Sequence, residues 1–234
     1  MNNKLIDFIS KHNINEFRDL LSVCIGKSLV NQSIWSQNIK DKNEIILDTD
    51  NGLLTIGEQN YKISFIGNEE KEKNFIWADA NLKNPDDTIL DVLKILEFGK
   101  EKHIAELENP KLILDEELTG NTLAIVSALL LNENGCYYKL KTEKENIYMY
   151  IKDYESEELN KSLSIQKFAN IIKKCITNYD LNQELFIESL IIMNNLGIEK
   201  TENKIISLFP GDLKCEVLFD ETKRITKLKF EAKK

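Results

Sequence analysis

The chain has 234 residues, of which 42% are hydrophobic and 30% are charged, and its formal net charge is −8. This composition predicts a packed core and excludes a disordered chain, and the length suits one large domain or a domain of about 150 residues with a smaller partner. The acidic balance disfavours nucleic acids and membrane surfaces as partners, because their phosphates and headgroups carry the same sign of charge.

No apolar run approaches the roughly 18 residues of a membrane-spanning helix, and residues 1–7 do not resemble a signal peptide. The cysteines form no CxxC motif, and each lies in an apolar pattern, so we expect reduced core thiols in a cytoplasmic protein. They are Cys24, Cys136, Cys175 and Cys215.

In chain order, the hydrophobic periodicity first predicts a helix over residues 14–40, with Asn13 as its candidate N-cap. A meander of antiparallel strands should follow, and its first two strands should be joined by a type I′ turn at Asn51-Gly52. The expected strands span 44–50, 53–57, 60–67 and 74–79.

Two helices and a hairpin are expected next. Pro85 and two acids open a helix that reaches about His103, and Thr119 is a candidate cap for a strongly apolar helix that covers residues 123–131. Tyr137 to Lys141 and Ile147 to Lys152 have the aromatic and β-branched content of a β-hairpin.

Residues 153–161 are polar and form the best linker candidate. Ser164 should cap a helix beyond it, a second helix should span 182–196 with Gly197 as its C′ residue, and a β-hairpin should close the chain. The sequence therefore predicts an α+β fold, with a domain at 1–154 and a smaller extension at 155–234 that packs on the first.

No phosphate-binding glycine loop, serine-hydrolase elbow, EF-hand or paired metal ligand is found, so we expect no cofactor and no metal, and a non-catalytic protein is favoured over an enzyme. Only His12 and His103 could serve as a histidine base, and neither has a second ligand nearby. Only Arg18 and Arg224 are arginines, which argues against multi-arginine anion sites.

One locally basic stretch is identified, near the C-terminus. On a terminal strand, lysines commonly protect an exposed edge from pairing with other chains, and the alternative is a docking surface for an acidic partner. The residues are Lys223, Arg224, Lys227, Lys229, Lys233 and Lys234.

Residues 74–81 read Asn-Phe-Ile-Trp-Ala-Asp-Ala-Asn. This string resembles the Thr-Trp-x-Trp-Ala-Trp-Ala-Asn signature of a bacterial family of domains of unknown function, and the resemblance extends over roughly residues 14–152. Phe75 and Asp79 depart from the signature, where the family usually has tryptophan. The resemblance implies an α+β fold with an antiparallel sheet and implies no activity.

Two functions compete at this stage. The first is a non-catalytic protein that binds another protein, of the immunity or regulatory type, because the sequence lacks catalytic motifs and has an acidic surface. The second is a small-molecule-binding protein or hydrolase, with a polar pocket beside Trp77 that is built from Asp79, Asn81 and His103. Burial of Trp77 in the core would favour the first function. The oligomeric state does not follow from the sequence.

Overall fold

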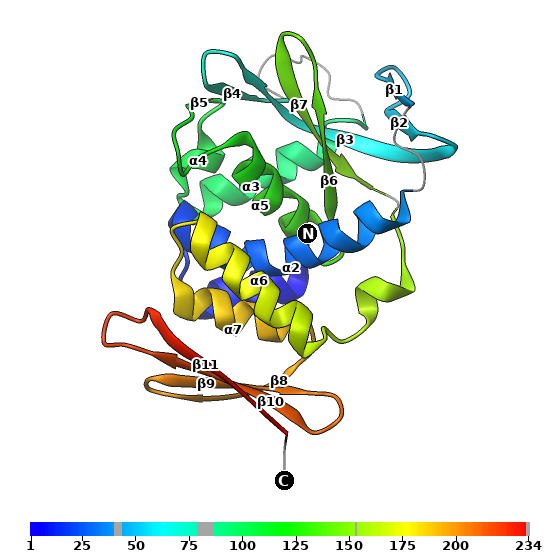
Figure 1. Ribbon diagram of the computed structural model, residues 1–234. Helices are drawn as coiled ribbons and strands as arrows, with labels where there is room; N and C mark the ends of the chain where they lie inside the picture. Colours follow the sequence, from blue (N-terminus) through cyan, green and yellow to red (C-terminus); the bar gives the residue numbers. More distant parts are fainter. Residues whose placement is uncertain (40–43, 79–86, 153, 233–234) are drawn as a thin grey trace.

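The computed structural model describes residues 1–39, 44–78, 87–152 and 154–232, and it has helices between two antiparallel sheets (Figure 1). The predicted α+β class is confirmed. The helices are α1 (Asn3–Lys11), α2 (Phe17–Asn38), α3 (Leu90–Lys102), α4 (Ala105–Glu108), α5 (Gly120–Leu131), the 3₁₀ helix η1 (Glu157–Asn160), α6 (Ile165–Asn178) and α7 (Gln183–Met193).

The strands match the predicted meander and hairpins closely. Two further strands, β8 and β9, extend the expected C-terminal hairpin into a four-stranded sheet. The strands are β1 (Ile45–Asp48), β2 (Leu53–Ile56), β3 (Gln59–Glu70), β4 (Asn74–Trp77), β5 (Lys111–Ile113), β6 (Cys136–Lys141), β7 (Glu145–Ile151), β8 (Gly197–Thr201), β9 (Lys204–Phe209), β10 (Leu213–Phe219) and β11 (Ile225–Ala232).

The larger sheet is organised around the long strand β3, which pairs with β2 and β4 along one edge and with β7 along the other. Gly67 of β3 lies opposite Trp77 of β4 and Tyr148 of β7. A Cβ atom at Gly67 would lie 2.4 Å from the Ile76 carbonyl oxygen and 2.7 Å from the ring of Phe75. Glycine is therefore required at this position, because the aromatic ring of Phe75 occupies the space over the strand.

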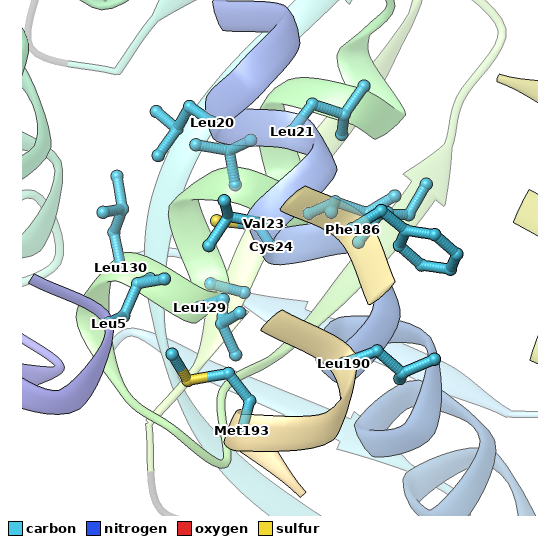
Figure 2. Close-up of a cluster of buried hydrophobic side chains, with 14 of the residues drawn as sticks. Leu5, Leu20, Leu21, Val23, Cys24, Leu129, Leu130, Phe186, Leu190 and Met193 are labelled. Atoms are coloured by element: carbon cyan, nitrogen blue, oxygen red, sulfur yellow. The ribbon is translucent and has the colours of Figure 1, made fainter. Parts of the chain in front are cut away.

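Helix α2 runs through the middle of the molecule, and fourteen of its 22 residues are buried. Side chains of α1, α5 and α7 converge on it, as Figure 2 shows for Leu5, Leu129 and Phe186. A Cβ atom at Gly26 would lie 2.9 Å from Leu190 Cδ1, so the missing side chain at Gly26 lets α7 approach α2 closely. The sequence pattern predicted a single apolar stripe, whereas the helix is covered on several sides.

Polar side chains of α2 bind backbone groups of neighbouring segments. Gln32 Nε2 donates to the Tyr137 carbonyl at 2.9 Å, and Gln32 Oε1 accepts from the Tyr137 N–H at 3.0 Å, which completes the free edge of β6. Asn31 Nδ2 donates to the carbonyls of Glu133 and Gly135. Lys27 Nζ donates to the Leu159 carbonyl of η1 at 3.1 Å, and burial lowers the pKa of this lysine. These bonds satisfy groups that would otherwise be buried without a partner.

The C-terminal segment packs on the opposite side of α2 from the larger sheet (Figure 1). In β9 and β10 alternate residues point inward, and Ile205, Cys215 and Val217 are fully buried under α6 and α7. Buried side chains from both sides of residue 154 belong to one hydrophobic cluster. The division into domains at 1–154 and 155–234 stays a prediction.

Two predictions about helix ends are wrong, and one helix was missed. Asn13 does not cap a helix that starts at residue 14, because α2 begins at Phe17 and Asn13 itself has a positive φ of 50°. Asn195, with φ of 55°, takes the left-handed position after α7 that was assigned to Gly197, and Gly197 instead begins β8. Helix α1 was not predicted at all.

The turn between β1 and β2 also differs from its prediction. Asp48 pairs with Leu53, so four residues form the loop, and among them only Gly52 has a positive φ. A type I′ turn requires positive φ at both Asn51 and Gly52. The Asp48 carboxylate instead accepts hydrogen bonds from the N–H and the side chain of Asn51, and these bonds stabilise the longer loop.

The four cysteines are buried and form no disulfide. Burial raises the pKa of the Cys136, Cys175 and Cys215 thiols to about 12, so they stay protonated and unreactive near neutral pH. None of the described helices combines the length and the apolar character that crossing a membrane requires.

A buried carboxylate joins α7 to α1 and β8. Glu188 is 4% exposed, and it lies 2.5 Å from Lys200 Nζ, 3.3 Å from His12 Nε2 and 3.6 Å from Lys11 Nζ. Burial alone would raise the pKa of this carboxyl, but the Lys200 hydrogen bond and the neighbouring positive charges outweigh it. The pKa of Glu188 therefore lies below its usual range.

Glu188→Gln should lower the free energy of unfolding by about 1–3 kcal/mol at pH 7. Because the pKa of Glu188 is lower in the folded than in the unfolded protein, its carboxylate stabilises the fold fully above the unfolded-state pKa of about 4.3. This stabilisation is lost as pH falls through the folded-state pKa. Urea denaturation between pH 3 and 7 should show that the difference in unfolding free energy between the variant and wild type shrinks below pH of about 4. A difference in unfolding free energy that does not change with pH would contradict this role of the carboxylate. Glu199→Gln, at an exposed position, is the control.

Gln32→Leu should lower the free energy of unfolding by about 1–3 kcal/mol, because two backbone groups of Tyr137 lose their partner. Gln37→Leu changes the same residue type at an exposed position of the same helix and should stay within about 0.5 kcal/mol of wild type. Chemical denaturation measures both variants. Equal effects of the two substitutions would show that the Gln32 bonds do not stabilise the fold.

Candidate functional site

Trp77 lies in the core and not in a pocket. It is 1% exposed, and its ring packs edge-on against Phe75, with 5.2 Å between ring centroids. The indole Nε1 is buried without a hydrogen-bond partner. Trp77 therefore contributes packing area to the sheet face, which is the simpler of the two roles that the sequence allowed.

Of the other predicted site residues, His103 lies within the described ranges, and it does not join Trp77. His103 follows α3 in a left-handed conformation with φ of 56°, its side chain is 89% exposed, and its Nδ1 lies 3.8 Å from Glu108 Oε1. No hydrogen bond, ion pair or ring contact links His103 to Trp77 in the described ranges. Asp79 and Asn81 lie outside the described residues.

Tyr148 lies beside this aromatic pair, and its hydroxyl donates to Glu69 Oε2 at 2.6 Å. Burial, together with the Glu69 hydrogen bond, raises the pKa of Tyr148 far above its usual value. The phenol therefore remains neutral and cannot act as a base at neutral pH. Among the residues that the structure describes, no group of three or more His, Cys, Asp or Glu side chains is placed to hold a metal ion.

A groove between α2 and α6 offers the clearest binding surface. Two hollows, of about 220 and 190 Å³, share four lining residues and so form one continuous groove, the α2–α6 groove. Its floor is apolar, and α6 lies against α2 in Figure 1. The floor consists of Leu29, Val30, Ile34, Leu163 and Ile171.

The caps and periodicities of the two helices place these side chains. Ser164 caps α6 as predicted, and its Oγ accepts from the Lys167 N–H at 3.3 Å. The inward stripe of α6 is Phe168 and Ile172, and Phe168 packs edge-on against Phe209 of β9. Ile171 lies beside this stripe, half-buried, and therefore faces the groove.

The rim of the groove is basic. Lys161, Lys167 and Lys174 line it, and none of the three has an ion-pair partner in the part of the chain that the structure describes. The acid among the lining residues is Glu158. Residues 161–178 contain four lysines and no Asp or Glu, in a chain with 39 acidic residues. This acid-free segment is a sequence signal that the analysis of composition and motifs missed.

The C-terminal strand is less basic than its sequence indicated. Lys229 lies 3.8 Å from Glu216 of β10, and Lys223 lies 3.5 Å from Glu184 of α7. Strand β11 is an edge of its sheet, as the edge-protection hypothesis expected. Lys223 and Lys229 are paired with carboxylates, whereas the rim lysines of the α2–α6 groove are not, so the groove is the stronger candidate for an acidic partner.

The two arginines line one hollow of about 240 Å³ at the start of α7, although they lie at opposite ends of the sequence. Arg18 is occupied, however, because its Nε lies 2.9 Å from Asp180 Oδ2 and its Nη2 donates to Asp180 Oδ1 and to the Leu181 carbonyl. This pairing joins α2 to the start of α7, and it uses the guanidinium N–H groups of Arg18 that would otherwise bind an anion.

A model of a family of unknown function, DUF6882, matches residues 18–154. The match covers α2 and the larger sheet and ends before α6. No curated protein and no solved structure matches the chain.

Trp77→Ala should lower the free energy of unfolding by about 3–5 kcal/mol, because it removes a fully buried ring from the Phe75 cluster. Trp77→Phe keeps an aromatic ring at the position and should cost distinctly less. Thermal and urea unfolding measure both variants. An alanine variant as stable as wild type would contradict a packing role and would revive the pocket hypothesis.

Proposed function

Because the chain belongs to DUF6882, a family of unknown function, we propose from its own surface that it is non-catalytic and binds another protein through the α2–α6 groove. This role is of the immunity or regulatory type. The proposed setting is a bacterial cytoplasm, for which the resemblance in the sequence and the buried, unpaired cysteines are the support.

The observation that supports binding is an apolar groove between two helices whose floor is partly exposed, at Leu29 and Ile171, beside the buried Val30, Ile34 and Leu163. Leu29 and Ile171 are half-buried on the floor, and Ser33 and Asn170 are exposed at its margins. An apolar surface with a polar rim is typical of sites where proteins dock. A groove between two helices accepts a helix from a partner, which lays its apolar face against the floor.

The groove combines two parts of the chain. Helix α2 lies within the residues that the family model matches, whereas α6 lies beyond them. A partner in the groove would contact both parts, so its recognition would depend on the C-terminal segment as well as on the family region.

The competing function, a small-molecule-binding protein or hydrolase with its site near Trp77, Asp79 and Asn81, has less support. The Trp77 ring is packed in the core, and the exposed His103 makes no contact with it. The neutral Tyr148 supplies no base beside it.

A photo-crosslinking side chain placed at Ser33 tests the proposal in the cells that make the protein. Ser33 is exposed and lines the groove, and Ser10 is an exposed serine on α1 that serves as the control position. We expect discrete crosslinked proteins from Ser33, identified by mass spectrometry and absent from Ser10. Identical products at both positions, or none at Ser33, would argue against a docking role for the groove.

A further inference from the structure

We infer that the segment that occupies the α2–α6 groove is an amphipathic helix whose apolar stripe is flanked by carboxylates. This inference rests on the proposed function and specifies the chemistry of the partner. It depends on three features of the described residues: the apolar side chains of the floor, the spacing of the rim lysines, and the absence of any acid on α6.

The rim lysines have the spacing of a helical ladder. Lys167, Ile171 and Lys174 are at i, i+4 and i+7 of α6, so they share one face, and Lys167 and Lys174 are about 10.5 Å apart along the helix axis. Lys161 continues the basic rim before the helix begins. Two carboxylates seven residues apart on a partner helix that lies along α6 have the same separation, with an apolar residue between them above Ile171.

The charges favour an acidic segment at this place and disfavour it elsewhere. The whole chain has a net charge of −8, so most of the surface repels carboxylates. Residues 161–178 reverse that sign locally, and Lys161, Lys167 and Lys174 have no carboxylate partner within the described ranges. An acidic helix therefore gains attraction along this rim, which favours one position and orientation in the groove. A basic helix would leave these lysines facing like charges.

The opposite wall of the groove has no comparable charge. Ser33 lies at the margin of α2, and Glu158 lies near the end of the groove where Lys161 is located. The apolar floor supplies most of the affinity and the lysines supply selectivity and association rate, as in other charged-rim interfaces. Binding should therefore weaken as salt rises, because exposed charges are screened.

The test uses a display library of 18-residue segments with leucines at helical i, i+3, i+4 and i+7 spacing. The positions beside the leucines vary among Glu, Gln and Lys. The full-length protein selects segments, and fluorescence anisotropy then measures their dissociation constants. We expect selected segments to be enriched in Glu at positions seven residues apart.

A neighbouring lysine gives a matched control. Lys174→Glu and Lys173→Glu make the same charge change on adjacent exposed residues of α6, and only Lys174 lines the groove. Lys174→Glu and Lys167→Glu should each weaken binding of a Glu-rich segment by about 5–20-fold, and Lys173→Glu by less than about 3-fold. Equal effects at 173 and 174, or selection without preference for Glu, would overturn the acidic-helix inference and leave protein binding standing.

Two variants that block the groove test the proposed function separately from the acidic-helix inference. Ile171→Asp places a charge on the apolar floor, and Ser33→Trp fills the groove from an exposed position that does not endanger folding. Circular dichroism confirms that each variant is folded before binding is measured. If no selected segment binds wild type at least about 5-fold more tightly than the folded blocking variants, then the groove is not a docking site, and both proposals fall.

Discussion

Burial of helix α2 on several sides imposes the constraint on which the rest of the structure depends. A helix with fourteen buried residues needs apolar neighbours on several sides and hydrogen-bond partners for its buried polar side chains. Helices α1, α5 and α7 supply the apolar neighbours (Figure 2). Gln32, Asn31 and Lys27 obtain their partners from the backbone of β6, the loop before it and η1.

The same constraint connects the family region to the C-terminal segment. Lys27 reaches η1, Arg18 pairs with Asp180 ahead of α7, and the gap at Gly26 is filled by Leu190. Without η1, α6 and α7, one side of α2 would be exposed to water. The C-terminal segment therefore completes the core of the family region, and its own sheet in turn covers α6 and α7 (Figure 1).

The α2–α6 groove lies where this coverage of α2 is incomplete. Helix α6 contacts α2 less extensively than α5 and α7 do, and Leu29 stays half-buried on the floor beside the buried Val30 and Ile34. The lysines beside that floor have no acidic neighbours to pair with on α6. A partner helix with carboxylates would cover the remaining apolar side of α2 and neutralise the rim in one step.

Local rules predicted much of the fold. Thr119 and Ser164 cap their helices, and the alternation in residues 213–219 gives β10, because caps and strand periodicity depend on nearby residues. The left-handed positions at Asn195 and Asn13 were missed although they are local helix C-caps, in which the Leu196 N–H donates to the Ile191 carbonyl and the Ile14 N–H to the Ile9 carbonyl. Trp77 of the predicted site serves packing, whereas Asp79 and Asn81 lie outside the described residues, so a site near them stays a prediction. The groove joins residues about 130 positions apart in sequence, a distance that periodicity does not bridge.

Native-state amide hydrogen exchange along a denaturant gradient tests the role of α2 most directly. If α2 completes one core, its central amides and those of α5 and α7 should exchange only through global unfolding, with one free energy and one denaturant dependence. A sub-global opening that releases α7 and the C-terminal sheet while α2 and α5 keep full protection would contradict this account. It would show that the C-terminal segment is a separate unit and that the groove joins two independent parts.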